Sequence, residues 1–305
     1  MTRHRPRPEA GAARPRVAYL GPEGTFSEEA LFAGTARGSV EPLAEPGIFE
    51  AAGAVREGRA DWAIVPIENS LEGSVNATLD LLADGEGALR VVGEQLLRVR
   101  HSLIAAAKVD LGEIELVLTH PQVPGQCLRF LRGELPGAQV LPAASTAEAV
   151  RTVVADGGRG RAAIGTLLAA QIYGGVVLRE SVQDRDDNET RFVWLGRGDA
   201  GGSPPLQQHG EEGWKTSIVF WGEGAARPGW LVRCLNELAD RDVNLTRIES
   251  RPRRERLGSY MFFADLEGSI EDEAVSSALA AMGGASEEVR VLGSYRAARP
   301  ATLAP

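Results

Sequence analysis

The chain has 305 residues, of which 43% are apolar and 25% are charged. This length is large for one compact core and suits two domains, and the composition is that of a folded protein. The net charge of −9 argues against a nucleic-acid partner, because neutralising phosphates requires a basic surface. An anionic substrate stays open, since a few arginines can dominate one pocket.

The residues that usually hold metals or cofactors are few and scattered. Cys127 and Cys234 lie far apart without CxxC spacing, which favours a reducing compartment. The four histidines lack HxxxH or HExxH spacing, so no metal site is expected. Lys108 and Lys215 are the two lysines, and neither is in a promising setting for a Schiff base. We expect no cofactor.

The first 16 residues are rich in Arg and Pro and lack the apolar core of a secretory signal. The sequence also has no apolar run of about 20 residues, the length that crosses a bilayer. Residues 1–16 are therefore expected to be a disordered leader, and the protein is expected to be cytoplasmic with no membrane contact.

From residue 17, short apolar runs alternate with segments of helical period. Strands are predicted at residues 17–20, 62–67, 90–97, 102–106, 114–119, 162–165, 176–182 and 190–195. Helices are predicted at residues 27–33, 48–55, 75–82, 126–135, 147–155 and 167–173. This alternation indicates open, mainly parallel sheets, which bind ligands beyond the carboxyl ends of their strands. Residues 17–196 are expected to form one large sheet or two lobes.

Residues 197–213 have the Gly-, Pro- and Gln-rich composition of a linker. Beyond the linker, strands are predicted at residues 216–221, 244–250, 259–266 and 289–293, and helix faces are marked by Leu231, Leu235, Leu238, Val275, Leu279 and Met282. The resulting βαββαβ order is the ferredoxin-like plan, expected over residues 214–296. Residues 297–305 are expected to be a tail.

Polar residues follow several predicted strands or begin helices. In Gly-Pro-Glu-Gly-Thr-Phe-Ser (residues 21–27), the helix start favours a carboxylate, although an ordinary capped turn explains it too. Asn69 can both donate and accept hydrogen bonds and Ser70 adds a hydroxyl, and the alternative is a simple strand-to-helix turn. Ser145 and Thr146 are interpreted first as a helix cap. Cys127 is interpreted as a core residue.

Three further side chains carry groups that can bind a substrate or act in catalysis. Gln126 can donate to a substrate oxygen, and Arg191 can hold a carboxylate through two parallel hydrogen bonds. His101 begins a strand, and for it we favour a structural role over catalysis.

Together these segments resemble the prephenate dehydratase family. The resemblance depends on residues 21–27, on Pro-Ile-Glu-Asn-Ser at 66–70 and on Thr-Arg-Phe at 190–192, which occur in the family's order. The C-terminal part resembles an ACT domain, and its Glu-Ser-Arg-Pro segment at 249–252 is typical of the phenylalanine-sensing version. The resemblance spans essentially all of residues 17–295.

This resemblance implies a cofactor-free enzyme that converts prephenate into phenylpyruvate, water and carbon dioxide in L-phenylalanine biosynthesis. Its fold would have two α/β lobes similar to type II periplasmic binding proteins, with the active site in the cleft between them. The implied catalytic residues are Thr190, Arg191, Asn69 and Gln126, and the implied substrate-binding residues are Thr25, Ser70, Thr119, Ser145 and Thr146. We hypothesise that Arg191 grips a carboxylate while Thr190 donates to the leaving oxygen.

The resemblance also implies L-phenylalanine as an effector and a homodimer or homotetramer, because ACT domains commonly pair. The implied effector-binding residues are Gly229, Trp230, Leu231, Val232, Glu249, Ser250, Arg251 and Pro252. Trp230 departs from the family's Gly-Ala-Leu-Val pattern. Its indole is expected to fill the effector pocket, reshape it, or repack a dimer interface.

Other functions stay open. Arogenate dehydratase performs the same elimination on the amino analogue of prephenate. A non-enzymatic amino-acid sensor would share the two lobes and the ACT module, but the intact Thr-Arg-Phe and Glu-Asn-Ser segments argue against it. A periplasmic solute-binding protein is disfavoured by the absent signal and by the appended domain.

Overall fold

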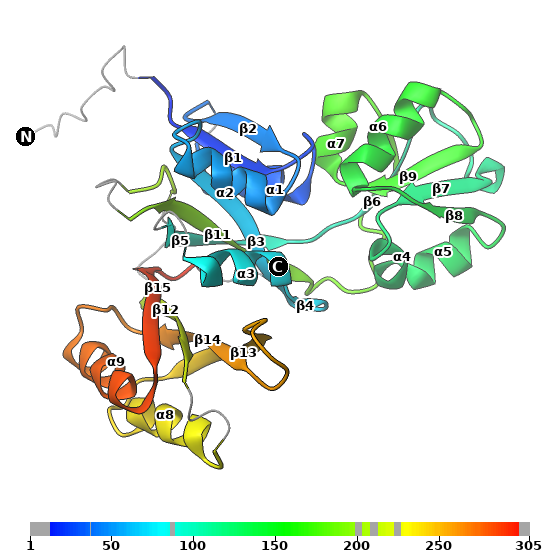
Figure 1. The fold of residues 1–305 in the computed structure, drawn as a ribbon. Helices are drawn as coiled ribbons and strands as arrows, with labels where there is room; N and C mark the ends of the chain where they lie inside the picture. Colours follow the sequence, from blue (N-terminus) through cyan, green and yellow to red (C-terminus); the bar gives the residue numbers. More distant parts are fainter. Residues whose placement is uncertain are drawn as a thin grey trace, which may run out of the picture.

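The computed structural model describes residues 13–36, 38–85, 89–198, 203–207, 213–222 and 227–298. These residues form three sheets, arranged as two α/β lobes and a smaller third unit (Figure 1). Most of the expected leader, much of the expected linker and most of the expected tail lie outside the described residues. No helix in the described part of the chain is long and apolar enough to cross a bilayer.

The sheet of lobe 1 has the strand order β2-β1-β3-β11-β5, and β4 pairs with the end of β3. Its strands are β1 (Arg16–Leu20), β2 (Glu41–Glu45), β3 (Trp62–Asn69), β4 (Gly73–Ser74), β5 (Leu89–Arg98) and β11 (Glu189–Arg197). Its helices are α1 (Phe26–Gly34), α2 (Ile48–Arg56) and α3 (Asn76–Asp84). Strands β1, β2 and β3 are parallel, whereas β11 runs antiparallel to both β3 and β5.

The sheet of lobe 2 has the strand order β10-β6-β9-β7-β8. Its strands are β6 (Ser102–Ala105), β7 (Leu116–Thr119), β8 (Gln139–Pro142), β9 (Arg161–Gly165) and β10 (Val176–Arg179). Its helices are η2 (Leu111–Glu113, a 3-10 helix), α4 (Val123–Gln126), α5 (Leu128–Glu134), α6 (Thr146–Asp156) and α7 (Leu167–Tyr173). Cys127 is fully buried in the core of this lobe, as the sequence predicted.

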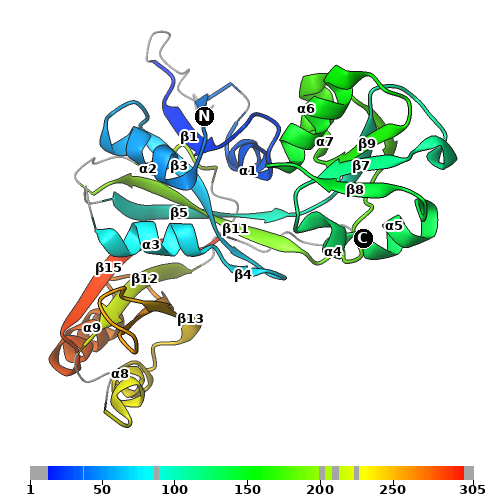
Figure 2. The same cartoon turned by 45° about the vertical axis from the view of Figure 1, so that its right-hand side comes forward.

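The prediction of mainly parallel sheets is wrong, because both sheets are mixed. The chain leaves lobe 1 along β5 and returns along β11, and these neighbouring strands therefore run in opposite directions (Figure 2). The crossing segments bond to one another, since the Val99 N–H donates to the Asn188 carbonyl at 2.8 Å and the Val182 N–H to the His101 carbonyl at 2.9 Å. Two crossing segments therefore join the two lobes.

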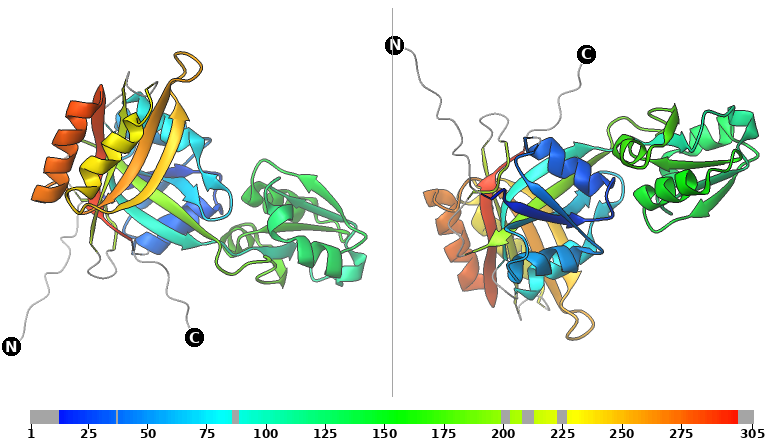
Figure 3. Two further views of the ribbon diagram at one scale, coloured as in Figure 1. Left: turned by 90° about the horizontal axis from the view of Figure 1, so that it is seen from below. Right: turned by 90° about the horizontal axis from the view of Figure 1, so that it is seen from above.

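The third unit confirms the predicted βαββαβ order. Its elements are β12 (Trp214–Trp221), α8 (Trp230–Ala239), β13 (Leu245–Pro252), β14 (Tyr260–Glu267), α9 (Glu273–Ala285) and β15 (Glu288–Arg296). The sheet is antiparallel in the order β13-β14-β12-β15. Helices α8 and α9 cover one face, and the unit lies against lobe 1 and apart from lobe 2 (Figure 3).

The third unit and lobe 1 share one hydrophobic core. Phe263 and Leu292 of the unit belong to the same buried cluster as Val65 and Val91 of lobe 1. Gly293 approaches Val91 so closely that an added Cβ would lie 2.0 Å from the Val91 carbonyl oxygen. Glycine is therefore required at this contact, and the two parts pack directly on each other.

Candidate active site

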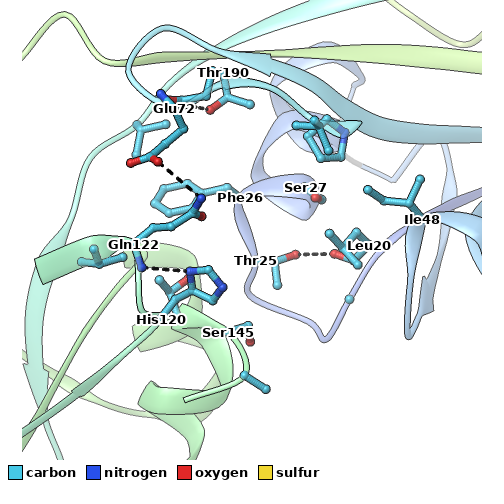
Figure 4. Close-up of a pocket in the computed structure, with 18 of the residues that line it drawn as sticks. Leu20, Thr25, Phe26, Ser27, Ile48, Glu72, His120, Gln122, Ser145 and Thr190 are labelled. Atoms are coloured by element: carbon cyan, nitrogen blue, oxygen red, sulfur yellow. Dashed lines mark hydrogen bonds between the residues drawn. The ribbon is translucent and has the colours of Figure 1, made fainter. Parts of the chain in front are cut away.

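A cleft of about 1090 Å³ lies between the two lobes (Figure 4). Lobe 1 contributes the start of α1, the end of β3 and part of β11, while lobe 2 contributes α4 and the start of α6. Of the predicted site residues, those that line it are Thr25, Asn69, Gln126, Ser145, Thr146 and Thr190. The structure thus brings together residues that are up to 165 positions apart in the sequence, which is the separation of Thr25 and Thr190.

The hydroxyl of Thr190 is oriented by Asn69. The Asn69 side-chain nitrogen donates to Thr190 Oγ1 at 2.9 Å. The Asn69 amide oxygen accepts from the backbone N–H groups of Leu71 at 2.9 Å and Glu72 at 3.0 Å, which fixes which end of the amide faces the threonine. Because Oγ1 already accepts this bond, the proton of Thr190 can be donated into the cleft.

Asn188 joins the two lobes within the site, and the sequence did not single it out. It is completely buried. Its Oδ1 accepts from Asn69 Nδ2 at 2.9 Å, and its Nδ2 donates to Gln126 Oε1 at 3.1 Å. The sequence did contain a signal for Asn188. Side chains two positions apart in an extended segment lie on the same face, so Asn188 is expected on the face that carries Thr190.

His101 also orients Gln126. Its Nε2 lies 3.0 Å from Gln126 Oε1. Since an amide oxygen only accepts hydrogen bonds, Nε2 carries the proton and Nδ1, which is buried without a partner among the described residues, does not. Burial lowers the pKa of His101, with partial opposition from Gln126, so the ring is neutral near pH 7. The Gln126 side-chain nitrogen is left facing Glu72 at 3.3 Å.

Two helices begin at the cleft, one from each lobe. Ser145 caps α6, as predicted, by accepting from the Glu148 N–H at 3.0 Å. Thr25 precedes α1, but it does not cap it, because its hydroxyl donates to the Leu20 carbonyl at 2.8 Å. Backbone N–H groups and the dipole at a helix start attract anions. The cleft therefore has a place for negative charge on each side.

Arg191 does not face the cleft, and the hypothesis that it grips a substrate carboxylate is wrong. Side chains alternate along a strand, so Thr190 and Phe192 line the cleft while Arg191 points to the other side of the sheet. There its Nη1 lies 2.7 Å from Asp265 Oδ2 and its Nε lies 3.0 Å from Glu94 Oε2. Arg191 instead ties lobe 1 to the third unit.

Thr119 and Ser70 also lie outside the cleft lining, so neither is placed to bind a substrate there. Thr119 is 1% exposed, and its hydroxyl donates to the Ile164 carbonyl at 2.8 Å inside the sheet of lobe 2. The Ser70 hydroxyl accepts from the Glu189 N–H at 3.0 Å, where the chain re-enters lobe 1. Both hydroxyls therefore hydrogen-bond to backbone groups outside the cleft.

The indole of Trp230 lies in the core of the third unit. It is 3% exposed, its Nε1 donates to the Ala285 carbonyl at 2.8 Å, and its ring centroid lies 6.0 Å from Phe220 and 5.9 Å from Phe262. The expectation that this indole fills or reshapes an effector pocket, or repacks a dimer interface, stays a prediction. On the same helix, Val232 is 59% exposed.

Gly229 and Leu231 belong to the start of α8, and the four predicted effector residues of the Glu-Ser-Arg-Pro segment lie on two faces of β13. Side chains alternate along this strand, and those of Glu249 and Arg251 face lobe 1, whereas Ser250 and Pro252 are exposed. Glu249 Oε2 accepts from the Ser74 hydroxyl at 3.0 Å. Arg251 Nη2 lies 2.8 Å from the carboxylate of Asp80 in α3.

A second contact between the lobes lies beside the cleft. The Thr166 hydroxyl of lobe 2 donates to the Gly24 carbonyl of lobe 1 at 2.6 Å, and Tyr173 OH donates to the Glu23 carbonyl at 2.8 Å. The Leu168 N–H reaches Glu29 Oε1 at 3.4 Å. The loop before α1 is therefore docked on α7.

Glu29 is expected to make stability depend on pH. Burial raises its pKa from the ordinary 4.5 to about 7, against a smaller lowering by the Leu168 N–H. The folded state therefore binds a proton that the unfolded state releases, and stability falls as pH rises from about 4.5 to about 7. Urea unfolding at about pH 5 and about pH 8 should show a smaller drop in Glu29→Gln than in the wild type. The exposed Glu134→Gln is the control, and an unchanged drop in Glu29→Gln would contradict the assignment.

The fold and the cleft define an α/β enzyme of two lobes with an appended regulatory-type sheet. The chain belongs to the prephenate dehydratase family, whose model matches residues 17–200, and an ACT-domain model matches residues 224–284. It is 42% identical over 294 residues to a prephenate dehydratase of Mycolicibacterium vanbaalenii, covering 92% of this chain and 91% of the relative.

Solved structures agree with this membership. A prephenate dehydratase from Arthrobacter aurescens in complex with L-Phe is 38% identical, with a TM-score of 0.83 over 95% of this chain and 93% of that chain. A protein described as a novel type of quorum-quenching acylase is 30% identical, with a TM-score of 0.81 over 93% of this chain and 98% of that chain. The same architecture therefore occurs in proteins described by different activities.

Proposed function

We propose that this chain converts prephenate into phenylpyruvate, carbon dioxide and water without a cofactor. The observation that carries the proposal is the Thr190 hydroxyl, which accepts from Asn69 and keeps its own proton for the cleft. In prephenate, the bond between the ring and its carboxylate breaks and releases carbon dioxide. The electron pair moves through the ring, makes it aromatic and expels the ring hydroxyl as hydroxide, which takes up a proton from solvent to give water.

Thr190 donates a hydrogen bond to the departing oxygen, and Asn69 holds Thr190 in place. General-acid assistance of this kind typically accelerates a step by about 10²–10⁴-fold. Gln126 acts from lobe 2, where Asn188 and His101 fix its amide oxygen. The remaining acceleration comes from holding the dianion in one geometry within the cleft.

The starts of α1 and α6 take the anion-binding role that the sequence assigned to Arg191. Thr25, Ser145 and Thr146 line these starts. Charge at a helix start contributes about 0.3–1 kcal/mol when exposed and up to about 2 kcal/mol when partly buried. Arg151 also lines the cleft, but its guanidinium is 2.8 Å from the Glu148 carboxylate. Helix starts from both lobes fit a substrate with two carboxylates.

Arogenate is the second candidate substrate, because the cleft is also lined by an acidic side chain. Glu72 stands beside Gln126 and is able to pair with the ammonium group of arogenate. The test is turnover of purified protein with prephenate and separately with arogenate, following phenylpyruvate and phenylalanine. Phenylpyruvate formed without added cofactor is the expected result. Phenylalanine from arogenate alone would favour the second candidate, and no product from either would favour a non-enzymatic sensor.

We also propose L-phenylalanine as the effector of the ACT domain in a cytoplasmic homo-oligomer. A related protein was solved in complex with L-Phe. Strand β13 is a sheet edge, and Ile248 on it is 41% exposed, which suits pairing with a second copy. Effector coupling is typically about 1–3 kcal/mol. Calorimetry with L-phenylalanine and light scattering test the two parts separately.

A further inference from the structure

Ser74 is a residue of the cleft lining that is held by the ACT domain. It belongs to the short strand β4 and lines the cleft. Its hydroxyl accepts from Arg247 Nη2 at 2.7 Å and donates to Glu249 Oε2 at 3.0 Å. Both partners come from β13, so one hydroxyl group links the catalytic cleft to the regulatory sheet.

From Ser74, a continuous set of contacts leads to Thr190. Strand β4 pairs with the end of β3, with Ser74 opposite Glu68 and Gly73 opposite Asn69. Arg247 Nε also lies 3.3 Å from Glu68 Oε2, so this arginine holds both partners of the first pair. Asn69 belongs to the second pair, and it is the residue that donates to Thr190.

The face of β13 that carries these contacts is firmly attached to lobe 1. Arg247 is 9% exposed, and Arg251 makes a two-oxygen contact with Asp80 at 2.8 and 2.9 Å. Bonds in which one partner is charged are stronger than neutral ones and more specific in direction. The position of β13 therefore fixes the position of Ser74.

We propose that Arg247 and Glu249 are positioning residues for the dehydration, acting through Ser74 on the turn that holds Asn69. The inference rests on the proposed function, since it concerns the same cleft. The Glu-Ser-Arg-Pro segment would then have a second role, which is to position the cleft wall of the same chain through Glu249. Glu249 holds the cleft wall, and the neighbouring Ser250 stays free for contacts on the outer face.

The test compares kcat and KM for prephenate in Ser74→Ala, Glu249→Gln and the double variant. Each single variant should lower kcat about three- to tenfold, the size of one typical hydrogen bond lost, with less than about a twofold change in KM. The double variant should lose no more than Ser74→Ala alone, because the contact that Glu249→Gln breaks is already absent when the Ser74 hydroxyl is removed. Ser74→Thr keeps the hydroxyl and should recover most of kcat.

Glu271→Gln removes an exposed carboxylate of the same domain and is the matched control. Wild-type kcat in both single variants, or a double variant whose loss is the product of the two single losses, would overturn the inference. A loss in Ser74→Ala that appears in KM and is absent from Glu249→Gln would also overturn it, because Ser74 would then act on substrate directly. An inactive wild-type protein would instead overturn the proposed function.

Discussion

Replacing Thr190 by alanine is expected to lower kcat for prephenate by about 10²–10⁴-fold, the usual contribution of a positioned proton donor. The substitution removes the hydroxyl that accepts from Asn69 and donates into the cleft. Alanine keeps the backbone pairing of β11 with β3 and β5, so the neighbouring strands stay in place. Steady-state formation of phenylpyruvate measures the effect, and the circular dichroism spectrum should be unchanged.

Two companion variants make the Thr190 result specific. Thr190→Ser keeps the hydroxyl and should retain activity within about tenfold of wild type, since the same donor is present. Thr152→Ala removes an exposed threonine of α6 and should leave kcat unchanged. A Thr190→Ala protein with near-normal turnover would remove Thr190 from the mechanism.

Arg191→Leu is expected to destabilise the protein by about 3–5 kcal/mol, the usual result of removing one partner from a buried charge pair. Asp265 and Glu94 are each 2% exposed and would lose their common cation. Lys215 continues to pair with Glu94 at 2.7 Å, whereas among the described residues Asp265 keeps the Ser217 hydroxyl as a donor and Arg247 as a cation at 4.0 Å. The midpoint of urea unfolding measures the loss.

The pH dependence of this variant provides an independent check. Burial opposes ionisation of Asp265, but the Arg191 guanidinium, helped by the Ser217 hydroxyl and Arg247, outweighs it and holds the pKa of Asp265 below its ordinary value of 3.8. The stabilisation is therefore present above about pH 4 and is lost as pH falls through the lowered pKa. In Arg191→Leu this loss on acidification should shrink.

Arg185→Leu serves as the surface control for Arg191. Arg185 pairs with Asp187 at 2.7 Å, but both side chains are exposed, and solvent screening makes such pairs weak. The control should unfold near the wild-type urea concentration. Equal stability of the two variants would mean that the contact of Arg191 with Asp265 contributes little.

Elements with a strong apolar pattern were predictable from the sequence. The helix predicted at residues 167–173 has the observed bounds of α7, and the βαββαβ order of the third unit is confirmed. Strand β2 was missed because Glu41 and Glu45 share one face of this edge strand with half-buried Leu43, which leaves little apolar signal. The direction of β11 was unpredictable for another reason, since periodicity does not report which neighbour a strand joins.

The cleft could be anticipated from polar residues at strand ends, and the placement of Asn69, Gln126 and Thr190 along one cleft agrees with that expectation. The side to which Arg191 points was predictable in principle, because its neighbours on the strand face the cleft. Its partners were not, because Asp265 lies 74 positions further along the chain and meets Arg191 only after two domains pack.

The apolar core that lobe 1 shares with the third unit limits how this enzyme can be engineered. A shortened gene ending near residue 198 would leave the Val65 and Val91 side of lobe 1 exposed to water, and Arg191 would lose its contact with Asp265. Such a fragment would be prone to aggregate, as exposed apolar patches generally are. Single substitutions on the exposed face of the third unit are therefore expected to preserve the fold better than removal of the whole unit.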